Sequence, residues 1–260
     1  MHEIVVAVIL GIIEGITEFL PISSTGHLLM AEHFLGKQTD LFNAVIQCGA
    51  VVAVVVVFNE RLSKLTRCWK WAESRDYLLK LALAFFITGS VGLVLKKLGL
   101  KLPHDPKPVA IATLVGGVLF IVVERWLKGR PTTSEVTWTI AAAIGAAQLL
   151  APIFPGASRS GTTILMGLAL GLSRPAAAEF SFLLGIPTLL SVGGLEIFQS
   201  LRHPEGAGQN WIPLGLGTLV AAVMAFVAVK WLLRYVQHNS FEGFGWYRIV
   251  LGVLMLLLLP

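Results

Sequence analysis

The sequence predicts an all-α polytopic membrane protein with about six transmembrane helices and two re-entrant helical hairpins. Of the 260 residues, 55% are hydrophobic and only 13% are charged, whereas soluble domains carry about 25% charged residues. The mean hydropathy is +0.78. Apolar residues come in long blocks between short polar loops, and 214–233 carries no charge except Lys230. That length spans a bilayer, which argues against the alternative of a large soluble core.

Six full-length spans follow from these blocks. The loop 59–77 is the densest basic cluster, so the positive-inside rule makes it cytoplasmic. Loops 126–136 and 235–245, the latter flanked by Arg248, then lie on the same side, and 97–107 lies outside. The net charge of +5 therefore indicates topology and contact with anionic membrane lipids rather than nucleic acid. The predicted spans are 42–58, 78–96, 108–125, 176–200, 213–234 and 246–259.

Two apolar segments do not read as simple spans. Residues 4–35 are broken at Pro21 and Gly26, and residues 137–170 are broken at Pro152, Pro155 and Gly156. Each segment forms either two spans or a re-entrant hairpin of two half-helices. Irregular backbone at membrane depth is tolerated only where it is buried in protein or lines a wet cavity.

The two broken segments also resemble each other. Setting Pro21 on Pro155 aligns "GIIEGITEFLPISSTG" with "GAAQLLAPIFPGASRS" and pairs Ser24 with Ser158. Three predicted spans follow each copy, and an odd number of spans places the copies in opposite orientations. Such an inverted-topology repeat has its functional site near the midplane. We therefore expect one membrane domain, 1–260, with repeats at about 1–130 and 131–260.

The stretch "EGITEFLPISSTGH" places two acids on the first broken segment. Glu14 and Glu18 are four residues apart, so a helix sets both on one face. A charge at the centre of a membrane helix costs roughly 2.5–3.5 kcal/mol. Two such acids indicate a divalent-cation site or an acid/base pair that faces a wet cavity. The alternative is a shallow helix whose acids reach the membrane interface.

Hydroxyl groups and a histidine follow the same turn. Ser23, Ser24 and Thr25 precede an apolar helix, as capping residues do, and the same geometry also suits an anion. His27 is either structural or, beside two acids and a hydroxyl, a group that activates a serine nucleophile.

The partner stretch "PGASRSGTT" contributes the one basic residue between Arg130 and Arg174, which is Arg159. An arginine among the hydroxyls of Ser158, Ser160 and Thr162 suits phosphate oxygens. The alternative is a helix cap with an arginine paired to a buried glutamate. Together the two stretches hold the groups that phosphoryl transfer needs. No Walker loop, GxGxxG or HExxH occurs, so the phosphate ester is expected to be a lipid.

At these residues the sequence closely resembles the undecaprenyl-diphosphate phosphatase family, which is also known for bacitracin resistance. The two stretches carry the family's signatures, and the resemblance extends to "FNAVIQCGAVVAVVVVF" and "AAAEFSFLLGIPTLL". It implies a bacterial inner-membrane hydrolase that converts undecaprenyl diphosphate to the monophosphate and phosphate, recycling the lipid for cell-wall synthesis. It also implies dependence on a divalent cation, Mg²⁺ or Ca²⁺, and a site that faces the periplasm.

The resemblance also implies roles by position. Glu14 and Glu18 would bind the cation or act as acid/base groups, and Ser24 would be the leading nucleophile. His27 would assist Ser24 or be the nucleophile itself, and Arg159 would hold the diphosphate. Attack by metal-activated water fits the same residues. Supporting phosphate contacts are expected from Ser23, Thr25, Ser158, Ser160 and Thr162.

The expected partners are a polyprenyl diphosphate lipid and membrane lipids, with a homodimer as the expected assembly and no nucleic acid. A second interpretation is a flippase for polyprenyl phosphate, because broken helices in inverted repeats are a transporter design. Ser24 and His27 beside two acids favour the enzyme, since a carrier needs these groups only for binding.

Overall fold

Helices form nearly all of the protein that the computed structural model describes, which is residues 2–68, 71–97, 105–202 and 210–259. The described residues contain no strand, and a single isolated bridge pairs Thr133 with Leu172. The all-α prediction is therefore confirmed. The helices are α1 His2–Thr17, α2 Ser24–Leu35, α3 Asp40–Val57, α4 Asn59–Arg67, α5 Ala72–Lys97, α6 Pro106–Leu127, α7 Trp138–Gln148, α8 Leu150–Ile153, α9 Arg159–Ala169, α10 Arg174–Arg202, α11 Trp211–His238 and α12 Glu242–Leu258.

Five of the described helices are long and apolar enough to cross a membrane: α3, α5, α6, α10 and α11. The chain is therefore a multi-pass membrane protein. The sixth predicted span, 246–259, falls in α12, whose 17 residues are at the lower limit of a spanning helix, so the count of six stays a prediction. The basic loop 59–77 contains α4, a helix that was not predicted. Most of the predicted outer loop 97–107 lies outside the described residues.

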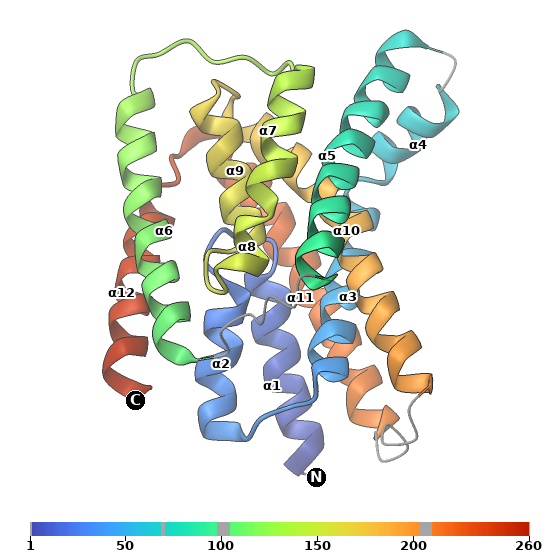
Figure 1. Ribbon diagram of the computed structural model, residues 1–260, viewed down its shortest axis with the longest axis vertical. Helices are drawn as coiled ribbons and strands as arrows, with labels where there is room; N and C mark the ends of the chain where they lie inside the picture. Colours follow the sequence, from blue (N-terminus) through green and yellow to red (C-terminus); the bar gives the residue numbers. More distant parts are fainter. Residues whose placement is uncertain (1, 69–70, 98–104, 203–209, 260) are drawn as a thin grey trace.

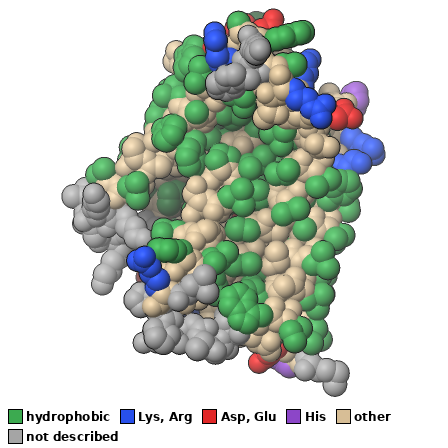
Figure 2. All heavy atoms as spheres, turned by 90° about the vertical axis from the view of Figure 1, so that its right-hand side faces the viewer, with side chains coloured by type: hydrophobic (Ala, Val, Ile, Leu, Met, Phe, Trp, Pro, Cys, Tyr) green, Lys and Arg blue, Asp and Glu red, His purple; other side chains and the backbone are tan. Residues whose placement is uncertain are grey.

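The surface agrees with a lipid environment. Large apolar side chains are exposed along the long helices, among them Phe86, Val122 and Leu219. Figure 2 shows hydrophobic side chains over the middle of one face, with charged side chains gathered toward its upper and lower ends. A soluble monomer does not expose so much contiguous apolar surface.

Glycines allow several helix pairs to approach closely. A Cβ atom added at Gly11 of α1 would collide with the backbone of Gly217 in α11, and one at Gly117 of α6 would lie 2.6 Å from the carbonyl oxygen of Gly245 in α12. Small residues at such contacts are typical of membrane helices, which associate through packing rather than through a hydrophobic driving force. These pairs pack α1 against α11 and α6 against α12.

Two helical hairpins enter the bundle from opposite ends (Figure 1). The first consists of α1 and α2, the second of α7, α8 and α9, and their turns meet near mid-height. The predicted breaks at Pro21 and Pro155 are confirmed, because both residues lie in these turns. The breaks predicted at Gly26 and Pro152 are wrong, because Gly26 lies inside α2 and Pro152 lies inside the short helix α8. The repeat boundaries near residue 130 stay a prediction.

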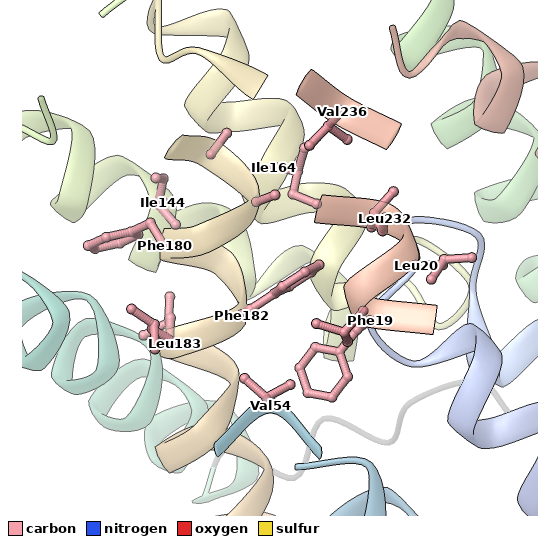
Figure 3. Packing of buried hydrophobic residues seen from close by; sticks show 14 of the residues in the cluster. Phe19, Leu20, Val54, Ile144, Ile164, Phe180, Phe182, Leu183, Leu232 and Val236 are labelled. Atoms are coloured by element: carbon pink, nitrogen blue, oxygen red, sulfur yellow. The ribbon is translucent and has the colours of Figure 1, made fainter. Parts of the chain in front are cut away.

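The main hydrophobic core surrounds the first turn. Phe19 is fully buried, and its ring meets that of Phe182 from α10 edge-on, with ring centroids 5.4 Å apart. In Figure 3, Phe19 lies among Val54, Phe182 and Leu232. The core therefore fixes the residue that directly follows Glu18.

Candidate active site

Two serines with left-handed backbone begin the second arms of the hairpins. Ser23 has a φ of 74° and Ser158 a φ of 70°, and no other non-glycine residue in the described ranges has a positive φ. Each hydroxyl oxygen accepts a hydrogen bond at 3.2 Å from a backbone N–H three residues on, at Gly26 and Gly161. Such backbone costs roughly 1–3 kcal/mol per residue and clusters at functional sites. Ser23, rather than the predicted Ser24, is thus the structural counterpart of Ser158.

The carboxylate of Glu18 joins the two predicted stretches. The Ser24 hydroxyl donates a hydrogen bond to Oε2 at 2.7 Å. Nε and Nη2 of Arg159, 141 residues further along the chain, each lie 3.4 Å from Oε1. Both members of this ion pair are buried, with side chains 6% and 9% exposed. The structure therefore brings Glu18, Ser24 and Arg159 together.

Helix α10 and the Phe19 ring contact the Arg159 side chain. Nη1 donates to the backbone carbonyl of Ser181 at 3.2 Å, and the guanidinium lies over the Phe19 ring, 5.2 Å from its centroid. At Gly185, an added Cβ would lie 2.6 Å from Nη1. The absence of a side chain at that position leaves room for the guanidinium.

Glu14 is the unsatisfied group of the site. Its side chain is fully buried, and neither carboxylate oxygen has a hydrogen-bond partner among the described residues. The N–H of Glu18 donates to the carbonyl of Glu14 at 2.9 Å, so helical geometry continues past α1 and keeps both acids on one face. A buried carboxylate without a partner is costly.

Glu14 and Glu18 fit a cation that shares its ligands with a substrate. The described residues contain no cluster of three or more His, Cys, Asp or Glu able to hold a metal ion. Mg²⁺ is commonly bound through one or two carboxylates together with substrate phosphates and water. The unpartnered oxygens of Glu14 suit that arrangement, whereas Glu18 already contacts Ser24 and Arg159.

His27 does not contact Ser24 through a hydrogen bond. Its Nδ1 lies 2.7 Å from the carbonyl of Ser23, and its Nε2 lies 2.7 Å from the hydroxyl of Tyr247. A carbonyl only accepts, so Nδ1 carries the proton in the neutral ring and Nε2 accepts from the tyrosine. Both ring nitrogens are thus occupied, and the Ser24 hydroxyl faces Glu18 instead.

The remaining predicted hydroxyls mostly bind the protein itself. Ser160 donates to the carbonyls of Glu18 at 3.3 Å and Leu20 at 3.0 Å, which joins the second hairpin to the first. Thr162 donates to the carbonyl of Arg159 at 3.0 Å, and Thr25 is exposed beside the turn. Their contact with phosphate stays a prediction.

Arg248 of α12 is the residue of the site that the sequence analysis missed. It is fully buried, and its guanidinium donates to the carbonyls of Pro21 at 3.2 Å and of Gly156 and Ala157 at 3.0 Å each. It donates as well to the α6 carbonyl of Thr113 at 3.1 Å. Its interpretation as a loop-flanking topology signal is wrong. The sequence did indicate a buried functional or structural role, because Arg248 is the only charged residue in the predicted span 246–259.

Comparison with known proteins fits the site. A profile of the family described as bacitracin resistance protein BacA matches residues 7–254. The chain belongs to this family. Among its relatives, an undecaprenyl-diphosphatase of Rhizobium etli is 49% identical over 251 residues, which cover 96% of this chain and 95% of the relative. An undecaprenyl-diphosphatase of Xylella fastidiosa is 46% identical over 257 residues, 98% of each chain. One of Xanthomonas oryzae pv. oryzae is 44% identical over 261 residues, with 100% and 98% covered.

Proposed function

We propose that this chain is an undecaprenyl-diphosphate phosphatase, which hydrolyses the lipid diphosphate to undecaprenyl phosphate and inorganic phosphate. One observation carries the proposal: a single buried carboxylate, Glu18, binds both a serine hydroxyl and an arginine from the two hairpins. The relatives named undecaprenyl-diphosphatase support it, because they align over nearly the whole chain. The reaction returns the carrier lipid to cell-wall synthesis, which accounts for the link to bacitracin resistance.

The contacts support Ser24 as the nucleophile and Glu18 as its base. The Ser24 oxygen attacks the terminal phosphorus while its proton passes to Glu18 Oε2, the atom to which it already donates. The bond from phosphorus to the bridging oxygen breaks, and undecaprenyl phosphate leaves. Water then cleaves the phosphoserine and releases phosphate. Direct attack by water, with Glu18 as base, uses the same groups.

Arg159 supplies positive charge to the transferring group. Its Nε and Nη2 rest on Glu18 at 3.4 Å, a long contact that leaves donor capacity for phosphate oxygens. An arginine fork binds such oxygens in a bidentate manner and stabilises charge that develops in the transition state. Ser181 and Phe19 fix the guanidinium beside the reacting atoms.

Glu14 and Glu18 would hold a divalent cation, Mg²⁺ or Ca²⁺, together with diphosphate oxygens. Bound there, the cation would supply charge neutralisation for the diphosphate. The support is the pair of unpartnered, fully buried oxygens of Glu14.

The architecture that we infer has six spans and two re-entrant hairpins in an inverted repeat within the bacterial inner membrane. Five spanning helices and hairpins that enter from opposite ends support it. The basic loop 59–77 favours a cytoplasmic position for that end, and the family resemblance supports an opening of the site toward the periplasm. The homodimer stays a prediction, which the mass of the detergent-purified protein would test.

The test is phosphate release from undecaprenyl diphosphate by detergent-purified protein, with and without EDTA. Release that EDTA stops, and that Glu18→Gln, Ser24→Ala and Arg159→Ala each abolish, is the expected result. Ser191→Ala, at an exposed serine of α10, is the matched control and should retain activity. A folded wild-type protein that binds the lipid but releases no phosphate would overturn the proposal.

A further inference from the structure

The geometry points to a second element of the substrate site: a groove that holds the polyprenyl tail on the side of the basic loops. This inference rests on the proposed function. The groove has a volume of about 370 Å³ and lies between the turn after α1 and the facing parts of α11 and α12. That volume is within the range of roughly 300–1,000 Å³ of small-molecule pockets.

One end of the groove is formed by the turn after α1, which connects Glu18 to Ser24 and is called the catalytic turn below. Leu20 and Ile22 line it, and they flank Pro21 in the short segment between Glu18 and Ser24. The diphosphate of the substrate is bonded directly to the tail, so the first isoprene units must leave the site beside this segment. The groove therefore begins where the tail must begin.

The opposite wall of the groove is aromatic. The rings of Trp231 and Tyr235 on α11 stack with centroids 5.1 Å apart, and Phe244 of α12 meets Tyr235 edge-on at 5.5 Å. Tyr247 completes the wall, and its hydroxyl is bound to His27 of the site. Flat rings give a large apolar contact area at a small loss of side-chain entropy. This lining suits a branched hydrocarbon chain and offers no cation for a head group.

The groove opens toward lipid near the basic end of the molecule. Trp231 is 49% exposed, and the aromatic wall comes from the end of α11 and the start of α12, on either side of residues 239–241. In Figure 1 this end is opposite to the two termini. The tail is thus expected in the membrane half that contains the basic loops 59–77 and 126–136.

Gly243 offers a direct way to fill the groove. It is one of the lining residues, and a Cβ added there would meet only the Tyr235 hydroxyl, at an ordinary 3.5 Å. The variant Gly243→Leu therefore extends into the groove without a backbone clash. The matched control is Gly215→Leu, at an exposed glycine of α11 with nothing within 4 Å of an added Cβ.

The experiment compares kcat/KM for undecaprenyl diphosphate and dimethylallyl diphosphate, which shares the head group but has almost no tail. In Gly243→Leu we expect kcat/KM for the long substrate to fall about tenfold or more, mainly through KM, with the short substrate unaffected. Gly215→Leu should match wild type on both substrates. Trp231→Ala, which removes part of the wall, should also raise KM for the long substrate alone.

An unchanged kcat/KM for undecaprenyl diphosphate in both groove variants would overturn the proposal that the groove binds the tail. It would leave the proposed phosphatase activity standing. Equal losses on the two substrates would overturn it too, because they would indicate a disturbed catalytic turn. Absence of phosphate release by the wild type from either substrate would instead overturn the proposed function.

Discussion

The guanidinium of Arg159 lies directly against Gly185 of the neighbouring helix α10. A Cβ atom at Gly185 would come within 2.6 Å of Nη1 and 2.9 Å of Cζ. Position 185 thus controls where the charge of Arg159 sits, although its own residue has no functional group.

Gly185→Ala should displace the Arg159 guanidinium and weaken diphosphate binding. A hydrogen bond to a charged group contributes about 1.5–3 kcal/mol, so we expect kcat/KM to fall by about tenfold or more. The three atoms nearest to the added Cβ all belong to the Arg159 guanidinium, so the backbone of α10 should keep its position. Gly194→Ala in the same helix, where an added Cβ meets nothing within 4 Å, is the control. Equal kinetics for the two variants would contradict this account of Arg159.

Tyr247→Phe should separate the structural from the catalytic interpretation of His27. The change removes the hydroxyl that lies 2.7 Å from Nε2 and keeps the ring. One neutral hydrogen bond contributes about 0.5–1.5 kcal/mol, so a structural His27 predicts a small loss of stability and an unchanged pH profile of kcat. The same unchanged profile is expected for His27→Gln. Loss of an ionisation from either profile would show that His27 exchanges a proton during the reaction.

Arg248→Lys should destabilise the protein strongly despite the retained charge. An ammonium has three donors on a single nitrogen and cannot reproduce a fork that spans the carbonyls of Pro21, Thr113 and Gly156. Each buried carbonyl left unpaired costs about 1–3 kcal/mol. Thermal unfolding in detergent would measure the loss, with the exposed Arg234→Lys as the control. A melting temperature equal to that of the control would show that the hydrogen bonds of Arg248 to these carbonyls do not stabilise the protein.

Removal of divalent cations should lower the thermal stability of the wild type but not of Glu14→Gln. A ligand that binds only the folded state stabilises it by about 2.7 kcal/mol at a hundredfold excess over its Kd. Addition of Mg²⁺ or Ca²⁺ after EDTA treatment should therefore raise the melting temperature of the wild type by several degrees. Glu135→Gln, at an exposed loop residue, should behave as the wild type. An equal rise in Glu14→Gln would remove Glu14 from the cation site.

Local sequence patterns predicted most of the fold. Long apolar blocks located the five spanning helices, because a spanning helix requires continuous apolar sequence, although α5 begins at Ala72 rather than at the predicted residue 78. Pro21 and Pro155 located the turns, since proline disfavours continued helix. The break predicted from Gly26 failed because a glycine can lie in the first turn of a helix. Its N–H donates to the capping hydroxyl of Ser23.

The site was less predictable, because its decisive contacts join residues far apart in the chain. The types and positions of Glu18, Ser24 and Arg159 were readable, but which group receives the Ser24 proton was not. From the sequence we expected His27 to assist Ser24, whereas the structure places the Ser24 hydroxyl on Glu18 and binds Nε2 of His27 to Tyr247, 220 residues away. Such long-range pairing leaves no trace in local periodicity.

The position of Arg248 also sets the order in which this molecule can mature. Its side chain binds carbonyls of both turns, at Pro21 and Gly156, yet it is synthesised long after them. While the ribosome is still translating α11, the turns of both hairpins lack their shared donor. The nascent protein is therefore expected to stay inactive until α12 has been inserted, so that assembly of the catalytic centre is among the last events of its biosynthesis.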